Sequence, residues 1–346
     1  MNPKVSIIIP VHNGGKTMQE CLSSVLSQSP GEIEVICIND GSTDGTAEIL
    51  REAARSDKRV RVFHFQENKG IVSALKTGLL EASGDYVMFA DSDDIQLPGA
   101  CENAVRLIEE YDVDILQFSI SVKHVKGHNI DGFLKELHCR PMESTGAKIL
   151  YDCFSMRRFP HNVYTKIYRR SICREAAENM PDIKLSSFSD LYVTFFLLYY
   201  AKTFRSVQDG PYYEYRFLGT GVSTQAPDAS QFAMLCEASG ILPRIEEFLR
   251  DRHEYAARRE LVEAIGIILR VDVVNKLLSM PEITKETIRL LVEHWGCEAV
   301  YDFIHETGLL DVPCGSRHHM VTDLAAANRK LAGLNTNITV VKKDET

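Results

Sequence analysis

The chain has 346 residues, of which 45% are hydrophobic and 25% are charged. This is the composition of a globular protein, and it excludes a disordered, collagen-like or coiled-coil chain. The 39 Lys and Arg residues are outnumbered by 48 Asp and Glu residues, which gives a formal net charge of −9. A negative chain of this kind is not a whole-surface nucleic-acid binder. We therefore expect no nucleic-acid partner.

The nine cysteines are scattered along the chain, and no CxxC pair occurs. The sequence therefore indicates neither a zinc knuckle nor a redox dithiol. Four of the cysteines stand among apolar residues, namely Cys21, Cys37, Cys101 and Cys236. Such a setting is typical of reduced thiols in a hydrophobic core, in a reducing compartment.

Targeting signals are not evident in the sequence. The amino-terminal stretch has no signal-peptide architecture. The longest apolar run, residues 191–201, is shorter than the roughly 20 residues that a membrane-spanning helix needs. These features predict a cytoplasmic protein with at most peripheral contact with a membrane.

The first 90 residues alternate strand patterns with helical patterns. Apolar runs predict buried parallel strands at residues 5–11, 33–38, 60–65 and 85–90. Apolar residues at helical spacing predict three helices. The first covers residues 18–26, the second begins after the polar residues 42–44 and ends near residue 55, and the third begins after Gly70. Ser42, Thr43 or Asp44 can cap the second of these helices. The alternation predicts an α/β fold with a mostly parallel sheet and helices on both faces.

The pattern changes in the second half of the chain. Apolar and polar residues alternate over residues 114–122, as in one strand with a solvent-exposed face. Residues 191–201 are predicted to form an apolar helix. From about residue 226 the apolar spacing is helical, with a last helix over residues 285–304 and a frayed tail. We predict an α/β domain at residues 1–224 and a helical domain at residues 225–346. The apolar stripes of the latter indicate a helical core or a homodimer contact, and a membrane-docking surface is the alternative.

A polar cluster follows each of the four predicted strands. The clusters are His12-Asn13, Asp40-Gly41-Ser42, Asn68-Lys69-Gly70 and Asp91-Ser92-Asp93. Open α/β sheets bind ligands beyond the carboxyl ends of their strands, so the four clusters should converge on one rim. This convergence is the most informative feature of the sequence.

Asp91 and Asp93 are candidate metal ligands. Alternate residues of an extended segment point the same way, so both carboxylates can face one ion. Mg²⁺ accepts one or two protein carboxylates and completes its shell with water and substrate phosphates. The DxD pattern therefore suggests a divalent cation that holds a nucleotide diphosphate, with an acidic turn as the alternative.

Asp40 is a candidate nucleoside ligand. A carboxylate at a strand end can accept hydrogen bonds from a base or a ribose, and Gly41 frees the backbone beside it. The alternative is a turn or cap residue, and the same alternative holds for Asn13 and Asn68. His12 can stack on a base or simply lie in solvent.

Several ordered motifs resemble the family 2 glycosyltransferases with the GT-A fold. Three of them are VSIIIPVHN, VICINDGSTDGT and ENKGIVSALKTGLLEASGDYVMFADSDD. Two more follow in the middle of the chain, NVYTKIYRRSI and SDLYVTFFLLYYAK. The resemblance covers roughly residues 3–224. It implies a GT-A, Rossmann-like sheet flanked by helices, with the helical region after it.

The resemblance also implies roles for the matching residues. Asp190 is the implied catalytic base. Asp91 and Asp93 are the implied ligands of Mn²⁺ or Mg²⁺, with Asp93 the more direct ligand. The implied contacts of the nucleotide-sugar are Pro10, His12, Asn13, Asp40, Asn68, Gly70, Lys76, Asp91 and Ser92.

The chain departs from the family pattern at four places. His12 stands where Tyr is usual, and Asn39 replaces the first Asp of an Asp-Asp-Gly-Ser motif. Leu75-Lys76 stands where Arg-Asn is frequent, and Ser189 replaces the Glu beside the catalytic Asp. The last change lowers the negative charge next to Asp190.

The implied function is metal-dependent, inverting transfer of a sugar from a nucleotide-sugar, UDP-linked by expectation. The acceptor is a hydroxyl of a glycan or a lipid-linked molecule in cell-surface polysaccharide synthesis, on the inner face of the cell membrane. One metal-binding pair and one separate base are the minimum for this chemistry. The alternative is a nucleotide-sugar-binding scaffold without turnover. A nucleotidyltransferase and a dinucleotide dehydrogenase are disfavoured, because their glycine-rich loops are absent after Val11.

The stretch from Arg157 to Arg174 is rich in Lys and Arg and has no acidic residue. It can attract an acceptor that carries phosphate, or the anionic inner leaflet. The alternative, which we favour, is a solvated basic face on which Lys166 and Arg169 pair with acidic neighbours.

Overall fold

The computed structural model describes residues 3–28, 32–124, 137, 139–217, 227–280, 282 and 284–296. The chain forms two compact units, residues 1–225 with 240–264 and residues 226–239 with 265–346. Across the described ranges, no helix combines the length and the apolar character needed to cross a bilayer.

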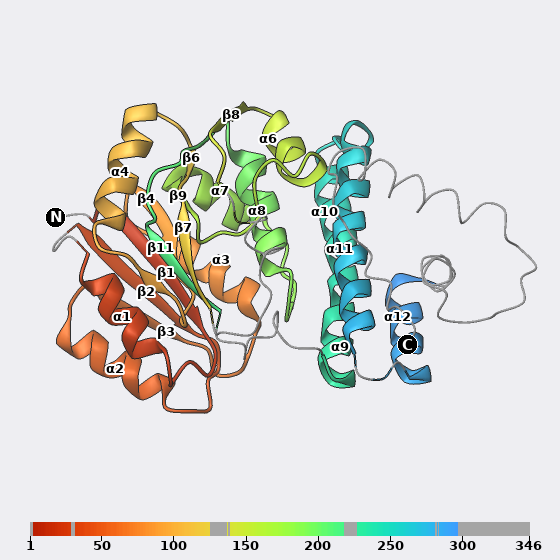
Figure 1. Ribbon diagram of the computed structural model, residues 1–346, viewed down its shortest axis with the longest axis horizontal. Helices are drawn as coiled ribbons and strands as arrows, with labels where there is room; N and C mark the ends of the chain where they lie inside the picture. The colour runs from red at the N-terminus through yellow and green to blue at the C-terminus, as the bar shows by residue number, and fades with distance from the viewer. Residues whose placement is uncertain are drawn as a thin grey trace, which may run out of the picture. The chain divides into compact units, whose positions relative to one another are not determined.

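The first unit is built on an eight-stranded sheet in the order β3-β2-β1-β4-β9-β6-β10-β8 (Figure 1). Its strands are β1 (Val5–Val11), β2 (Ile33–Asn39), β3 (Val60–His64), β4 (Tyr86–Phe89), β6 (Ile115–Gln117), β8 (Met142–Thr145), β9 (Lys166–Arg169) and β10 (Thr203–Ser206). β1 pairs in parallel with β2 and β4, and β2 with β3. β9 is antiparallel to β4 and β6, and β8 to β10. The predicted mostly parallel sheet is confirmed.

Helices cover both faces of this sheet, as Figure 1 shows. α1 (Met18–Leu26), α2 (Thr46–Ser56) and α4 (Ala100–Tyr111) lie on one face, where they share a core with Val5, Ile7, Ile9 and Val11 of β1. α3 (Ile71–Glu81), α7 (Arg170–Asn179) and α8 (Ser189–Tyr200) lie on the other. Successive side chains of a strand point to opposite faces, so a run that is apolar at every position must be covered twice.

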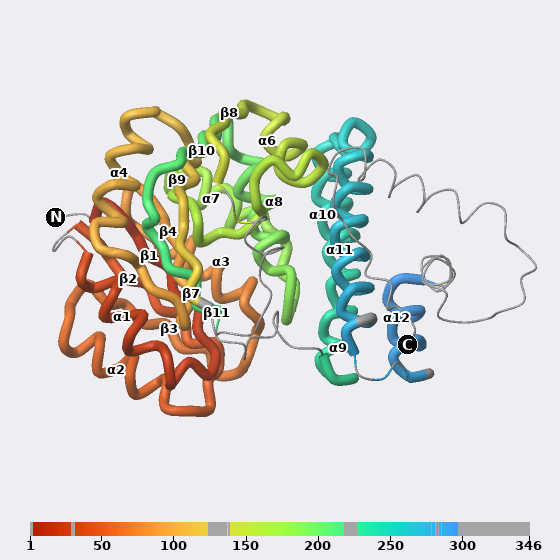
Figure 2. The backbone as a smooth tube through the Cα atoms, viewed as in Figure 1, coloured from red at the N-terminus to blue at the C-terminus, as the bar shows by residue number. Residues whose placement is uncertain are grey.

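A second, three-stranded sheet has the order β5-β11-β7. It consists of β5 (Ile95–Gln96), β7 (Ile120–His124) and β11 (Tyr213–Phe217), and the tube in Figure 2 shows β7 and β11 side by side. The prediction of one strand over residues 114–122 is therefore wrong. Two strands occupy this segment, since β6 ends at Gln117 in the main sheet and β7 begins at Ile120 in the second sheet.

The remaining elements are helical. They are α6 (Lys148–Leu150), a π-helical turn η1 (Tyr151–Ser155), α9 (Ala229–Cys236), η2 (Glu237–Gly240), α10 (Ile241–Asp251), η3 (Ala256–Arg258), α11 (Arg259–Ser279) and α12 (Lys285–Trp295). Capping boxes begin α9 at Asp228 and α12 at Thr284. Three parts of the prediction lie outside the described residues. They are residues 297–304 of the last predicted helix, the tail, and the boundary at residues 224–225. The division into two domains at that boundary stays a prediction.

The four cysteines predicted for the core are buried, free thiols. Burial raises the pKa of Cys37 and Cys101 to about 12. Such thiols stay protonated at neutral pH and act as small apolar side chains.

Candidate functional site

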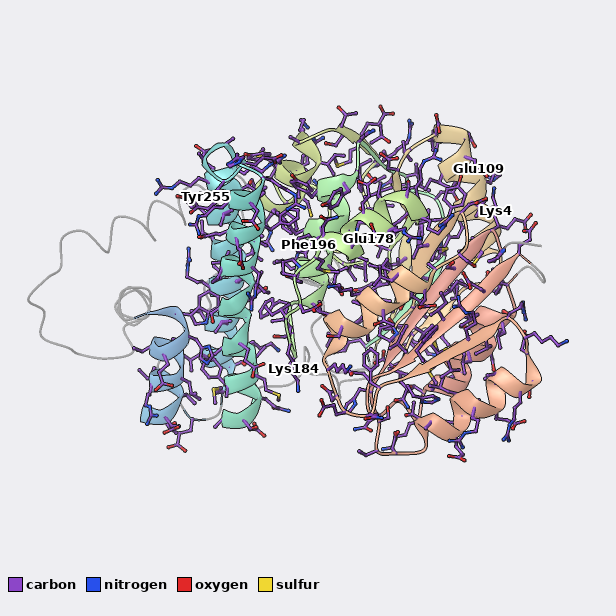
Figure 3. The ribbon with its side chains drawn as sticks, turned by 180° about the vertical axis from the view of Figure 1, so that it is seen from behind. Lys4, Glu109, Glu178, Lys184, Phe196 and Tyr255 are labelled. Atoms are coloured by element: carbon purple, nitrogen blue, oxygen red, sulfur yellow. The ribbon has the colours of Figure 1, made fainter. Side chains whose placement is uncertain are left out.

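The four polar clusters lie beyond the carboxyl ends of β1 to β4. Figure 3 shows Lys4 and Glu109, which form an ion pair of 2.7 Å, near the amino end of β1. Lys184 lies at the other end of the sheet in the same view. A Cβ atom built on Gly70 would lie 3.2 Å from Cγ of Lys184, so this end carries the third polar cluster.

Hydrogen bonds join the loops after β1 and β2. His12 Nδ1 lies 2.7 Å from the carbonyl oxygen of Asp40. The Asn13 side-chain oxygen accepts the backbone N–H of Thr43 at 2.9 Å, and the Asn13 N–H donates to Ser42 Oγ. Asn13 adopts a left-handed conformation with φ of 56°, which Asn tolerates better than most residues. The two loops are thus held as one surface from which His12 and Asn13 are exposed.

Asp40 joins the loops after β2 and β3. Its carboxylate is 4% exposed and accepts the backbone N–H groups of Lys69 at 2.6 Å and Gly70 at 2.9 Å. These amides lie just before the amino terminus of α3, where the helix dipole favours a negative charge. Each carboxylate oxygen has a further lone pair, so Asp40 keeps acceptor capacity for a base or a ribose.

Asp91 and Asp93 belong to an acidic turn, defined here as residues 91–94, in which the N–H of Asp94 donates to the carbonyl oxygen of Asp91 at 3.1 Å. Burial raises the pKa of Asp91 well above its usual range, and the charges of Asp94, Asp190 and Asp93 raise it further. Burial raises the pKa of Asp93 as well. Gathered anionic oxygens in a desolvated site favour a hard divalent cation such as Mg²⁺ or Mn²⁺.

The described residues contain no group of three or more His, Cys, Asp and Glu side chains arranged to hold a metal ion. Asp91 and Asp93 supply two carboxylates, and Mg²⁺ takes one or two when substrate phosphates and water complete its shell. The residues present therefore fit a cation shared with a diphosphate.

Asp190 lies in the first turn of α8. Burial raises its pKa to about 6, and the Lys166 ammonium and a hydrogen bond from the backbone of Val163 oppose that rise. Because the charge of Asp190 in turn raises the pKa of Asp91, the two carboxylates lie in one electrostatic environment. A carboxylate that titrates near pH 6 is a competent general base at neutral pH.

The other predicted contacts occupy the same rim or its support. Pro10 is buried at the end of β1, and Asn68 lies against Gly41, whose Cβ would come 2.5 Å from the Asn68 nitrogen. Ser92 lies against Gly14 of the first loop. Lys76 differs, because its ammonium donates to the Met180 carbonyl at 2.8 Å and to Asp182 at 2.6 Å. The geometry thus brings the clusters together, and their individual roles stay predictions.

Sequence reasoning missed the residues that support the acidic turn. Asp94 is 1% exposed and accepts hydrogen bonds from the hydroxyl of Tyr213 and the backbone N–H of Arg216. Burial raises the pKa of Asp94 to about 7. The partners lie more than a hundred residues away on β11, so no local pattern could reveal them.

The basic stretch divides between two environments. Arg169 pairs with Asp112 and Asp114, and Arg158 with Asp152, so the predicted pairing with acidic neighbours is confirmed for Arg169. It is wrong for Lys166, which is fully buried and donates to backbone and side-chain oxygens of residues 160–165. Lys166 lies on β9 in the middle of the sheet, where no solvated face exists.

A mostly parallel sheet with acidic and amide groups gathered beyond its carboxyl ends defines an α/β protein that binds its ligand at that edge. Residues 6–180 match the model of the family described as Glycosyl transferase family 2. The chain belongs to this family.

Individual relatives agree with this assignment. The chain is 30% identical over 216 residues to the putative glycosyltransferase EpsH of Bacillus subtilis, across 62% of this chain and 61% of EpsH. It is 33% identical over 180 residues to the uncharacterized glycosyltransferase YibD of Escherichia coli, across 49% of each. The alignments thus span about three fifths or less of these curated relatives.

Solved structures share the fold. TarS 1–349 of S. aureus in complex with UDP-GlcNAc aligns with a TM-score of 0.55 at 20% identity, over 88% of this chain and 92% of that one. A second structure of the same protein, with UDP, aligns with a TM-score of 0.53. This likeness supports the predicted GT-A-like α/β architecture.

Proposed function

We propose that this protein transfers a sugar from a UDP-sugar to a hydroxyl of a glycan or a lipid-linked acceptor, with inversion at the anomeric carbon. Two observations support the proposal, namely the effect of the Asp190 charge on Asp91 of the acidic turn and the position of Asp40 after the neighbouring strand β2. A separate base and a separate diphosphate site are what a single displacement needs.

Asp190 is the proposed general base. Its carboxylate takes the proton of the attacking hydroxyl as the new glycosidic bond forms and the bond to the diphosphate breaks. A pKa of about 6 leaves this group ionised at neutral pH yet basic enough to accept a proton. Burial of the site excludes water that would compete with the acceptor hydroxyl.

Asp91 and Asp93 are the proposed ligands of Mn²⁺ or Mg²⁺, with Asp93 the more direct. When bound, the cation supplies Lewis-acid stabilisation of the negative charge that develops on the leaving diphosphate. Asp40, Asn13 and Gly70 are proposed to orient the nucleoside, with Pro10, His12, Asn68, Lys76 and Ser92 as further contacts of the donor.

The choice of UDP rests on likeness to TarS, whose solved complexes contain UDP-GlcNAc and UDP. The acceptor class, cell-surface polysaccharide synthesis and a position on the inner face of the membrane rest on the family resemblance. Pairing of two chains through the helical region is a further part of this proposal.

A nucleotide-sugar-binding scaffold without turnover is the second candidate. Two observations favour it, namely the buried Ser189 in place of the usual Glu and the engagement of Lys76 with Asp182. Such a scaffold would be stabilised by UDP and a cation but would release no UDP from any donor.

The test is a screen of sugar nucleotides for UDP release and transfer, with Mn²⁺, with Mg²⁺ and with EDTA. Asp93→Ala should lose activity at least about 100-fold, whereas Asp85→Ala, an exposed carboxylate paired with Lys4, should retain it. Equal turnover by wild type and Asp93→Ala would contradict the metal role. Thermal stabilisation by UDP and Mn²⁺ without turnover of any donor would select the scaffold.

A further inference from the structure

The acidic turn is tied to a strand that lies far away in the sequence. Asp91 and Tyr213 are 122 residues apart, and Asp94 and Tyr213 are 119 apart. The connection is made by β11, whose residues Tyr213 and Glu214 pair with β5 immediately after the turn. The turn is therefore anchored to the small sheet as well as to the main one.

The Tyr213 hydroxyl bridges the two ends of the turn. It accepts the backbone N–H of Asp91 at 3.0 Å and donates to Oδ2 of Asp94 at 2.8 Å. One oxygen atom thus fixes both the peptide that enters Asp91 and the carboxylate that closes the turn. This bridge adds to the Asp94 N–H to Asp91 carbonyl bond within the turn.

A second residue of β11 completes the support. The backbone N–H of Arg216 donates to Oδ1 of Asp94 at 2.7 Å, and its Nε donates to the carbonyl oxygen of Asp93. Both oxygens of Asp94 thus accept hydrogen bonds from β11, and its side chain is buried, whereas Asp91 and Asp93 are only half-buried and are the carboxylates that a ligand can reach.

The ring of Tyr213 is enclosed by the core. The side chain is fully buried, and it stacks on Tyr164 with ring centroids 5.1 Å apart. Tyr164 stacks in turn on Tyr215 at 5.8 Å. The ring of Tyr213 is thus held by its stack on Tyr164, which is itself stacked on a second residue of β11, and the hydroxyl ties the turn to that strand.

We propose that Tyr213 is a positioning residue for divalent-cation binding, which acts by holding the Asp91 peptide and the Asp94 carboxylate through one hydroxyl. The proposal rests on the proposed function, in which Asp91 and Asp93 bind the cation. Residues that orient metal ligands without touching the metal change its affinity about 10–100-fold when they are altered. Tyr213 has the same relation to the acidic turn.

The test removes one oxygen atom and measures cation binding directly. Mn²⁺ is titrated into wild type, Tyr213→Phe and Tyr212→Phe with UDP present, and binding is followed by calorimetry and by the paramagnetic signal of free Mn²⁺. Tyr212→Phe is the matched control, because Tyr212 is also buried and its hydroxyl donates to Asp209 instead. Each variant loses one hydroxyl, and Tyr213→Phe should lose more stability in thermal melts, because its hydroxyl makes two hydrogen bonds and that of Tyr212 makes one.

Tyr213→Phe should weaken Mn²⁺ binding at least about tenfold, and Tyr212→Phe should bind Mn²⁺ as wild type does. Weaker binding in both variants to the same extent would mean a general loss of packing and would overturn the proposal. Wild-type Mn²⁺ affinity in Tyr213→Phe would overturn it while leaving the proposed function intact. Absence of Mn²⁺ binding in wild type with UDP would instead overturn the metal role of Asp91 and Asp93, and the inference with it.

Discussion

The carboxylate of Asp40 accepts the backbone N–H of Gly70 at 2.9 Å, across 30 residues of sequence. Its other oxygen accepts the N–H of Lys69 at 2.6 Å, so one buried side chain closes the gap between the loops after β2 and β3. The same carboxylate is the proposed ligand of the nucleoside. Under the proposed function, the same two oxygens would serve both the fold and the binding of the nucleoside.

Asp40→Asn should destabilise the protein. Asn has one acceptor oxygen, so its NH₂ group would face one of the two backbone N–H donors and leave that donor unpaired. The expected loss is about 1–3 kcal/mol of unfolding free energy, measured by urea denaturation, with weaker UDP binding in calorimetry. Asp85→Asn, at an exposed position, should change stability by less than about 0.5 kcal/mol. Equal stability of the two variants would show that the Asp40 bonds contribute nothing.

Gly41→Ala should push apart the loops after β2 and β3 by a steric clash. Gly41 has φ of +65°, and an added Cβ would lie 2.5 Å from the backbone nitrogen of Asn68. Left-handed backbone alone costs a non-glycine residue about 1–2 kcal/mol, and the clash adds to it. Gly45→Ala is the control, because its φ is −70° and nothing lies within 4 Å of its Cβ.

The melting temperatures of the two glycine variants test this prediction. The Gly41→Ala protein should melt several degrees below wild type, and the Gly45→Ala protein close to it. A melting temperature of Gly41→Ala equal to that of Gly45→Ala would show that the loops can move apart at little cost.

Local patterns predict the amino-terminal half of the fold well. The bounds predicted for β1 and α1 are those that the structure has. The prediction succeeds because β1 is buried on both faces and α1 buries one apolar stripe. Polar clusters at strand ends predict the rim for the same reason, since parallel strands end together. In these segments local propensity and tertiary packing favour the same conformation.

Contacts distant in sequence could not be predicted in this way. Tyr213 and Asp94 meet only because β5, β7 and β11 form a second sheet, and neither residue carries a local signal of the other. Lys166 is similar, because a lysine in a basic stretch indicates a solvated face, whereas its backbone lies on the buried strand β9. Whether a polar residue is buried depends on where its strand lies in the sheet, and a local sequence pattern does not give that position.

Lys166→Met should reveal how the buried ammonium supports the site. The Nζ atom donates to the Pro160 carbonyl at 2.9 Å and to the Asn162 carbonyl, and a methionine removes the donor from both. The expected loss is about 1–3 kcal/mol at pH 8, measured by urea denaturation. Lys202→Met, at an exposed lysine, should be near neutral.

The pH dependence identifies the cause of that loss. Burial lowers the pKa of Lys166 to about 8 from 10.5, so the unfolded chain binds more protons between these values. Stability from this group therefore rises with pH across that window. The gap between wild type and Lys166→Met should widen from pH 8 to pH 10, and a constant gap would exclude a buried, titrating ammonium.

Asp190→Asn should lose activity and gain stability. Burial raises the pKa of Asp190 to about 6, above the usual 3.8, so the folded protein binds more protons between these values and stability falls as pH rises through them. Above pH 6 the ionised carboxylate costs the fold on the order of 1–3 kcal/mol. Asn is neutral at every pH and keeps an acceptor for the Val163 N–H. The variant should therefore exceed wild type in unfolding free energy at pH 8, in EDTA, with the difference vanishing toward pH 4.

The activity of the same variant supplies the complementary measurement. A missing general base lowers turnover about 10²–10⁴-fold, and kcat/KM of wild type should rise with pH through about 6 as Asp190 ionises. The gain in stability follows from burial of the charge alone, so turnover and its pH dependence are what test the catalytic role. Full activity in Asp190→Asn would mean that another group on the rim is the general base. Loss of activity together with loss of stability would make Asp190 a structural carboxylate.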